Sequence, residues 1–295
     1  MTLPVQAHGI LAHYFYDGTG PRPQGSLSSA EWARGLDAYG DRLISADKWI
    51  DLAMGDRLRD EVCVTLDDGL REAYVYALPE LERRGLTACW NVYTQPLVGV
   101  PHNLERWRWV RNRAYGSLAG FYDAWDRLVD RERVEAEMLR ADPTYLSDYG
   151  YLTPVDRIFR WWRNRLPALE YEQAMLALEG GEGARPFIPD NHWIVPHELW
   201  RLHNAGHVIG NHTHTHPMEL DVLSEEQQET EWATAECLLT DFNPEVMTAS
   251  YPCGRRTAVS SEWLAKHEYT LAWGATMKGY APWEAPRLST GYWPR

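Results

Sequence analysis

Two short motifs in this chain carry side chains that could hold a metal ion. The run Gly-Asn-His-Thr-His-Thr-His-Pro offers imidazoles at His212, His214 and His216. The run Thr-Leu-Asp-Asp-Gly offers two adjacent carboxylates, Asp67 and Asp68. Two histidines and one carboxylate are a common ligand set for a catalytic divalent metal, and they leave one coordination position open. Because a second carboxylate beside that set could act as a general base, the motifs together predict a metal-dependent hydrolase.

The spacing of the three histidines leaves two arrangements open. His212 and His216 lie on the same side of both a helical turn and an extended strand. His214 would share that side in a strand but would point away in a helical turn. Pro217 disfavours helix at the preceding residue, which favours a loop or short strand. For the carboxylate pair, the alternative to a metal site is a cap on the helix expected to begin near Leu70.

The carboxylate pair follows a predicted buried strand. Residues 61–66 are apolar and β-branched, as is typical of strands in parallel sheets. A helix expected over 70–84 and a strand over 87–93 complete a strand–helix–strand unit, so the sheet is at least partly parallel. Such folds place active sites at the carboxyl ends of their strands. The first strand ends near His13, which could therefore face the same rim as Asp67.

Alternating helices and strands are also expected elsewhere along the chain. The histidine motif directly follows a short strand at 207–210. Further helices are expected at 28–39, 46–54, 195–203, 224–240 and 258–267, and further strands at 43–46, 247–251 and 269–272, before an aromatic, proline-rich tail. Residues 96–185 differ, because Arg, Glu, Trp and Tyr dominate there and the periodicity is helical through 118–140 and 154–179. We interpret 96–185 as a helical insertion within a single domain spanning 1–295.

Composition excludes several classes of partner. The chain has 295 residues and a formal net charge of −13, from 42 acidic and 29 basic residues. Nucleic acids and anionic membranes are bound through excess Lys and Arg, so neither is an expected partner. No apolar run reaches the roughly 18–20 residues of a membrane span, and the start lacks the features of a secretory signal. We expect a soluble, cytoplasmic protein whose scattered cysteines, including Cys63 and Cys89, are reduced.

Four motifs in a fixed order give the chain a family resemblance. They are Thr-Leu-Asp-Asp-Gly at 65–69, His-Thr-His-Thr-His at 212–216, Tyr-Pro-Cys-Gly at 251–254 and Pro-Arg-Leu at 286–288. In these motifs the chain resembles the polysaccharide deacetylase superfamily, the NodB-homology proteins that include carbohydrate esterase family 4. The resemblance covers about 1–95 and 190–290. It implies an α/β fold, a distorted (β/α) barrel, with the central region as a helical insertion.

The resemblance also implies roles for individual residues. Asp68, His212 and His216 would hold one divalent metal ion, most often zinc, with cobalt, nickel or manganese as alternatives. Asp67 would be the base that deprotonates the attacking water. The arginine that the family carries just before a proline is absent here, so the partner that keeps Asp67 ionised would be Arg287.

Two further roles concern the tetrahedral intermediate and the leaving amine. The resemblance implies that the backbone N–H of Tyr251 helps to stabilise the oxyanion. The family's late Leu-x-His motif, which supplies the acid, is absent, because no histidine follows residue 267. His13, His214 or Asp67 itself would then protonate the leaving amine.

The central region is where we expect the substrate to be selected. Its aromatic side chains could form a floor for a sugar ring, with helix packing or a subunit interface as the alternative. These aromatic residues are Trp107, Trp109, Trp161, Trp162, Tyr145, Tyr149 and Tyr151. Its basic side chains could bind a phosphate or carboxylate, with ordinary ion pairs as the alternative. These basic residues are Arg108, Arg111, Arg113, Arg160 and Arg163.

The sequence therefore predicts a metal-dependent hydrolase that removes an acetyl or formyl group from the nitrogen of an amino sugar or its conjugate. The partner would be a small molecule, and a homo-oligomer is left open. One alternative is an enzyme of the same fold that cleaves a non-sugar amide, such as a ureide or cyclic imide. A second alternative is a catalytically silent sugar-binding protein that kept the metal. The presence of both Asp67 and Arg287 counts against the silent protein.

Overall fold

The computed structural model divides the chain into two compact units. Unit 1 comprises residues 1–17, 27–102 and 190–295, and unit 2 comprises residues 18–26 and 103–189. The residues that the structure describes are 4–16, 18, 22–100, 103–147, 152–188, 191–240, 242, 248–277, 284–290 and 293. The central helices thus share a unit with a short N-terminal segment. The single domain with an insertion at 96–185 stays a prediction.

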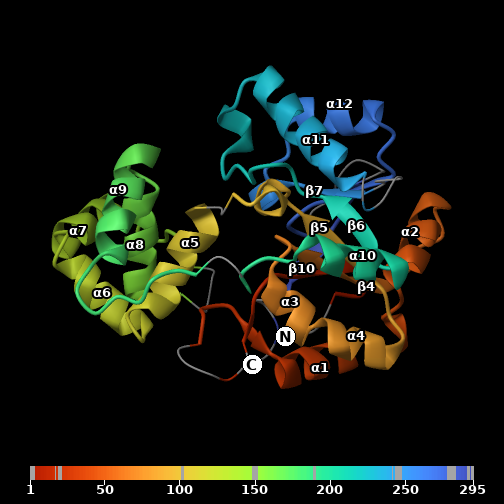
Figure 1. Ribbon diagram of the computed structural model, residues 1–295, viewed down its shortest axis with the longest axis horizontal. Coiled ribbons are helices and arrows are strands. Elements are labelled where there is room, and N and C mark those ends of the chain that lie inside the picture. Colours follow the sequence, from red (N-terminus) through yellow and green to blue (C-terminus); the bar gives the residue numbers. More distant parts are fainter. Residues whose placement is uncertain are drawn as a thin grey trace. The chain divides into compact units, whose positions relative to one another are not determined.

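Unit 1 is built on an eight-stranded sheet in which every neighbouring pair is parallel (Figure 1). In chain order its strands are β1 (His8–Ala12), β4 (Val62–Asp67), β5 (Ala88–Val92), β6 (Val208–Asn211), β7 (Thr248–Ser250), β8 (Leu271–Trp273), β9 (Glu284–Ala285) and β10 (Arg287–Ser289). Two residue pairs, β2 (Phe15–Tyr16) and β3 (Leu27–Ser28), form a separate small sheet. Because the main strands are parallel, their carboxyl ends meet at one rim.

The last strand segment closes the sheet into a barrel. β9 pairs with β8, while β10, which follows directly after Pro286, pairs with β1. The backbone N–H of Gly9 donates to the carbonyl of Pro286 at the crossover. The expected (β/α) barrel is confirmed, and the aromatic, proline-rich end of the chain contributes the two short strands that close it. Strands this short, interrupted by a residue without an N–H, leave no periodic signal in the sequence.

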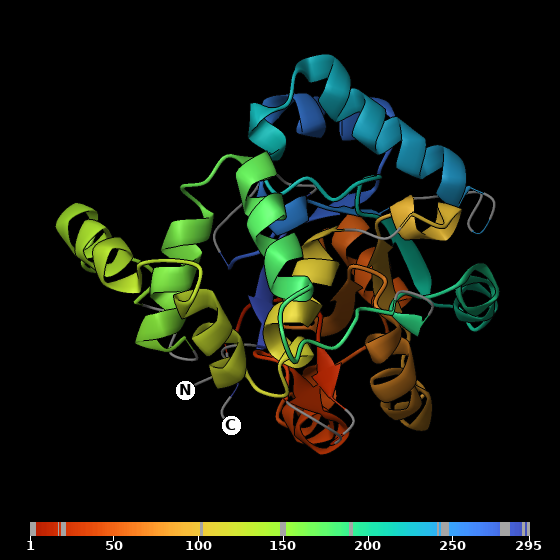
Figure 2. The ribbon, with the colours of Figure 1, turned by 60° about the vertical axis from the view of Figure 1, so that its left-hand side comes forward.

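Helices surround the barrel of unit 1 (Figures 1 and 2). They are α1 (Ser29–Asp37), α2 (Ala46–Met54), α3 (Arg71–Tyr76), α4 (Leu78–Arg84), α10 (Pro196–Asn204), α11 (Glu225–Leu239) and α12 (Ala258–Lys266). The single helix expected over 70–84 is instead two helices, because Pro79 lies in the first turn of α4 and starts a new helix. The strand expected at 43–46 is reduced to one bridge, between Leu43 and Val62.

Strand alternation sorts the side chains of the barrel into two layers. On β4, Val62, Val64 and Leu66 belong to the core packed beneath the helices. Cys63 lies on the other face with Cys89, in an apolar cluster that α2 closes through Trp49. Both thiols are free and buried, and burial raises the pKa of each well above its ordinary value. The same face of β4 then continues to Thr65 and Asp67, so the interior becomes polar toward the carboxyl rim.

Unit 2 is helical. Its helices are α5 (Asn103–Trp109), the π-helical segment η3 (Val110–Ala114), α6 (Leu118–Asp126), α7 (Arg131–Ala141), α8 (Pro154–Arg163) and α9 (Ala168–Glu179). Its apolar core includes Phe121, Trp125 and Phe159. A buried ion pair joins Arg111 to Asp156 at 2.6 Å. Among the described residues of the whole chain, no helix is long and apolar enough to cross a bilayer.

One buried histidine makes the stability of unit 1 depend on pH. His207 Nδ1 accepts hydrogen bonds from the Ala88 N–H at 3.0 Å and the Trp90 indole N–H at 3.2 Å, so the ring is neutral with its proton on Nε2. Burial lowers the pKa of His207 from 6.5 to about 4. Between pH 6.5 and 4, His207 is therefore protonated in the unfolded chain but stays neutral in the folded chain. The resulting loss of unfolding free energy approaches about 3 kcal/mol near pH 4.

We therefore expect His207→Asn to make the stability less dependent on pH between 6.5 and 4. The Asn carbonyl can accept in place of Nδ1 but does not titrate. Urea unfolding at several pH values measures the change in slope. The matched control is His197→Asn, at an exposed position on α10, which should keep the wild-type slope. An unchanged slope in His207→Asn would show that this ring does not control the acid response.

Candidate metal centre

Three buried side chains meet at the carboxyl rim of the barrel. Asp68 follows β4, while His212 and His216 follow β6, and one ligand atom from each lies within 4.8 Å of the other two. The Nε2 atoms of His212 and His216 are each 3.4 Å from Asp68 Oδ1. A tetrahedral ion with bonds of about 2.1 Å holds its ligand atoms about 3.4 Å apart. The donor types and the spacing therefore fit one divalent cation such as zinc.

The neighbours of His212 fix which ring nitrogen faces the site. Its Nδ1 lies 2.7 Å from the carbonyl of Ser250, so Nδ1 carries the proton and donates it. Nε2 is then left with a lone pair directed toward Asp68. A histidine held by a backbone carbonyl in this way is the usual arrangement for a metal ligand.

The backbone at the site adopts left-handed conformations that residues other than glycine seldom take. The φ angles of Asp68, Thr213 and His216 are 73°, 68° and 51°. Each such residue costs about 1–3 kcal/mol and persists only where the surroundings hold it. Gly69, next to Asp68, is also left-handed, at φ 58°. The turn after β4 is thus built to point Asp68 at the histidines, which is a stronger constraint than a helix cap requires.

A separate set of donors surrounds Asp67. Its Oδ1 accepts from the Asn91 amide and from the Arg287 guanidinium, both at 2.7 Å, and its Oδ2 accepts from Ser250 Oγ at 3.1 Å. Arg287 also donates to Ser250 Oγ at 2.8 Å and to the carbonyl of Gly274. All of these side chains are buried. The expected pairing of Arg287 with Asp67 is present in the structure.

The same contacts decide the ionisation of Asp67. Burial alone would raise the pKa of Asp67, but attraction to Arg287, and then to His212 and His13, lowers it well below its usual range. For Asp68, burial again acts upward, and the interaction with His212 is the largest effect that lowers the pKa, followed by attraction to His216. Asp67 is therefore a carboxylate at neutral pH, next to the three ligand atoms, with His212 Nε2 3.8 Å from its Oδ2.

Comparisons with known proteins agree with this geometry. The polysaccharide deacetylase family model matches residues 171–272, a stretch that holds both histidine ligands. Over this stretch the chain is similar to the polysaccharide deacetylases. Asp67, Asp68 and Arg287 lie outside the matched stretch. A comparison with curated proteins finds no match.

Several solved structures share the fold of this chain. The Streptococcus pyogenes deacetylase PplD, in complex with acetate, is 14% identical, with 97% of this chain and 93% of that chain covered and a TM-score of 0.58. IcaB from Ammonifex degensii is 16% identical, with 97% and 92% covered and a TM-score of 0.59. A de-N-acetylase from Aggregatibacter actinomycetemcomitans is 11% identical, with 96% and 94% covered and a TM-score of 0.57. At identities this low, the likeness shows the fold.

The two histidines considered as proton donors to the leaving amine lie in different surroundings. His13 follows β1, whose last residue Ala12 is opposite Leu66, so His13 emerges at the level of Asp67. It is half-buried, and its attraction is among the effects that lower the pKa of Asp67 and Asp68, after burial and the nearer partners.

His214, by contrast, is held by hydrogen bonds to the segment that follows β5. Its Nδ1 lies 2.8 Å from Thr94 Oγ1, and its carbonyl accepts from the Gln95 N–H at 2.9 Å. His214 is not in the ligand cluster that contains its neighbours His212 and His216. The segment that carries the three histidines is thus a loop, neither a helical turn nor a strand, and in it His214 lies outside the cluster formed by the other two rings.

The role expected for Tyr251 needs correction. Its backbone N–H donates to the carbonyl of Trp273 at 3.2 Å, as part of the pairing of β7 with β8. Its hydroxyl donates to Glu284 at 2.9 Å. Because the single amide proton is engaged within the sheet, Tyr251 has no free N–H to offer to an oxyanion.

The aromatic side chains of the central region are mainly structural. Trp107 and Trp161 are buried in the core of unit 2, and Trp109, Trp162 and Tyr145 pack against that core. Tyr149 and Tyr151 lie outside the described residues. These contacts favour the helix-packing alternative over an open floor for a sugar ring.

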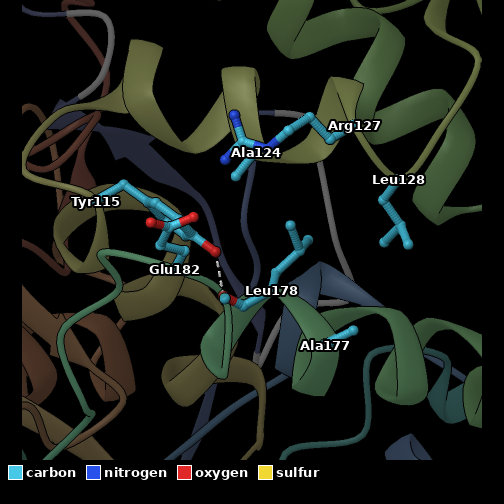
Figure 3. Close-up of a pocket in the computed structure, with 8 residues that line it drawn as sticks. Tyr115, Ala124, Arg127, Leu128, Ala177, Leu178 and Glu182 are labelled. Carbon is cyan, nitrogen blue, oxygen red and sulfur yellow. Dashed lines mark hydrogen bonds between the residues drawn. The ribbon is translucent and has the colours of Figure 1, made fainter.

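Two of the basic side chains have carboxylate partners within unit 2. Arg108 pairs with Glu105 at 2.9 Å, and Arg111 pairs with Asp156. Unit 2 also contains a pocket of about 220 Å³, where Arg127 and Glu182 accompany apolar side chains (Figure 3). At its edge the Tyr115 hydroxyl donates to the carbonyl of Leu178. The pocket is lined by no histidine or cysteine, and we assign it no reaction.

Proposed function

We propose that this protein is a metal-dependent amide hydrolase that removes an acetyl or formyl group from the nitrogen of an amino sugar or its conjugate. Polysaccharide deacetylases are hydrolases that act on amides, and the chain is similar to them over residues 171–272. The observation that carries the proposal is that two adjacent carboxylates have different partners. Asp68 joins two histidines, while Asp67 joins Arg287, Asn91 and Ser250.

The surroundings of Asp67 suit a general base. Its Oδ1 already accepts two bonds, from Asn91 and Arg287, which orient the carboxylate. Its Oδ2 accepts one described bond, from Ser250, and keeps a lone pair for a proton. Asp67 therefore takes a proton from the water that attacks the amide carbonyl, and Arg287 holds the carboxylate in place.

Asp68, His212 and His216 would hold the divalent ion. The chemistry supplied at this site by a bound ion would be Lewis acidity, which would polarise the carbonyl oxygen and make the water easier to deprotonate. Zinc suits an open site with two nitrogen ligands and one oxygen ligand.

His13 would complete the reaction by donating a proton to the leaving nitrogen. When the C–N bond breaks, the nitrogen takes the bonding pair and needs a proton to leave as a neutral amine. His13 lies at the same rim as Asp67 and is half-buried, so it can exchange protons with solvent. The proton that Asp67 received then returns to solvent, and the products are the free carboxylic acid and the amine.

The amino-sugar substrate is supported by the matched family and by the named activities of structurally similar proteins. The matched family is that of polysaccharide deacetylases. One neighbour is a de-N-acetylase and another is a deacetylase with acetate bound. The strongly acidic composition of this chain argues against nucleic acid as a substrate.

The test is a screen of N-acetyl and N-formyl amino sugars, with released acetate or formate measured. We expect wild-type protein loaded with one equivalent of zinc or cobalt to release acid, and chelator-treated protein not to. In His212→Ala we expect bound metal to fall from about one ion per chain to near zero, because two ligands hold an ion far more weakly than three. Release of acid by metal-free protein, or full metal retention in His212→Ala, would contradict the proposal.

A further inference from the structure

The loop that carries His216 is held from outside by a carboxylate on α11. Glu231 Oε2 accepts from the backbone N–H of His214 at 3.0 Å and from that of Thr215 at 2.7 Å. Its Oε1 accepts from the Thr215 hydroxyl at 2.6 Å. One side chain, from a helix that begins after the loop has ended, thus binds three donors on two consecutive loop residues.

Four other polar groups of the loop backbone are bound by neighbouring residues. The N–H of Thr213 donates to Asn211 Oδ1 at 2.8 Å, and that of His216 donates to Thr213 Oγ1 at 3.2 Å. The carbonyls of Thr213 and His214 accept from Thr94 and Gln95. Of the four consecutive N–H groups at 213–216, two therefore depend on local side chains and two depend on Glu231.

This loop needs support because its backbone is strained. Thr213 is β-branched and left-handed at φ 68°, and the ligand His216 is left-handed at φ 51°. Conformations of this kind persist only when neighbouring contacts determine them. If the bonds from Glu231 were removed, two backbone donors would lose their acceptor and the turn could relax to ordinary angles. The side chain of His216 would then leave the position that it shares with Asp68 and His212.

We propose that Glu231 is a positioning residue that pre-forms the metal site by holding the His214–Thr215 backbone, and through it His216. This proposal rests on the proposed function only in taking Asp68, His212 and His216 as metal ligands. Glu231 does not belong to the ligand cluster, so it acts on the metal through the loop. It resembles the outer partners that orient ligands in metalloproteins, whose loss typically weakens metal affinity 10–100-fold.

The test measures metal affinity directly. We expect the dissociation constant for Zn²⁺, measured by chelator competition, to rise 10–100-fold in Glu231→Ala. Glu231→Gln keeps one acceptor oxygen, so it should recover part of the affinity. In the Co²⁺-loaded protein, Glu231→Ala should also change the visible absorption bands, which report ligand geometry. A residue that served only general stability would not change these bands.

Two further variants keep the test decisive. Glu229→Ala removes an exposed carboxylate from the same helix and should leave the Zn²⁺ affinity at the wild-type value. If Glu231→Ala does not fold, Thr215→Val removes one of the three bonds and should still weaken binding several-fold. Wild-type affinity and an unchanged Co²⁺ spectrum in Glu231→Ala would overturn the role of Glu231 while leaving the proposed function intact. Absence of stoichiometric metal binding in the wild-type protein would overturn both.

Discussion

Asp67→Asn is expected to lower kcat for amide hydrolysis by about 10²–10⁴-fold while bound metal stays near one ion per chain. The asparagine keeps the shape of the side chain. Its carbonyl can accept from Asn91 and Arg287, and its amide can donate to Ser250 Oγ. What it lacks is a basic oxygen to take the proton of the attacking water. The measurements are released acid at saturating substrate and metal content on the same protein sample.

The adjacent carboxylate provides the matched control for this prediction. Asp68→Asn should bind metal much more weakly, because its oxygen is the one that lies 3.4 Å from both histidines. The two neighbouring substitutions therefore separate catalysis from metal binding. Near-wild-type turnover in Asp67→Asn, or equal loss of metal in the two variants, would refute the assignment of base and ligand.

Folding should survive Asp67→Asn, although at some cost. Arg287 is buried and would lose its only described carboxylate partner, and uncompensated buried charges are strongly destabilising. Its other contacts, with Ser250 and Gly274, remain. Activity should thus be compared at a temperature well below the thermal midpoint of the variant, so that loss of turnover is not loss of fold.

The metal ligands could be found from sequence because each is fixed by a local pattern. Asp68 follows an apolar run that reads as a buried strand, and His212 and His216 follow another strand. Parallel strands bring their carboxyl ends to one rim, so motifs far apart in the chain must meet there. The sorting of Asp67 from Asp68 came from the family resemblance, and the structure gives the two carboxylates different partners.

The support around these residues was less visible in the sequence. Asn91 is a single polar residue within the apolar strand β5, and Ser250 ends the three-residue strand β7, but what each side chain faces depends on strand register. Gly9 shows the same dependence, since an added Cβ there would lie 3.1 Å from Arg287 Cγ and 2.8 Å from the Trp273 ring. The reason for a glycine within a strand cannot be read from the sequence until its neighbours in the barrel are known.

The roles of two residues at the site could not have been predicted from the sequence. Glu231 looks like any acidic residue on an exposed helix, and only the path of the 213–216 loop gives it its role. Tyr251 shows the opposite case, because a motif suggested a free backbone N–H that the pairing of β7 with β8 consumes. Both depend on where backbone donors point, which residue types do not encode.

The proton donor can be identified by changing the leaving group. His13→Gln is expected to lower kcat for an N-acetyl amino sugar by about 10²–10³-fold, because an amine cannot leave as an anion. Hydrolysis of a nitrophenyl acetate should fall by no more than about 5-fold, because a nitrophenolate leaves without a proton. Metal content should match the wild type, since His13 is not in the ligand cluster.

His214→Asn is the informative comparison for this assignment. The Asn carbonyl can still meet Thr94 Oγ1 where His214 Nδ1 does now, so the loop should keep its shape. If His13 is the donor, His214→Asn should affect amide and ester alike and only slightly. If instead the amide-selective loss appears in His214→Asn, the donor is the loop histidine. If neither variant separates amide from ester, Asp67 returns its own proton to the leaving nitrogen and serves as both base and acid.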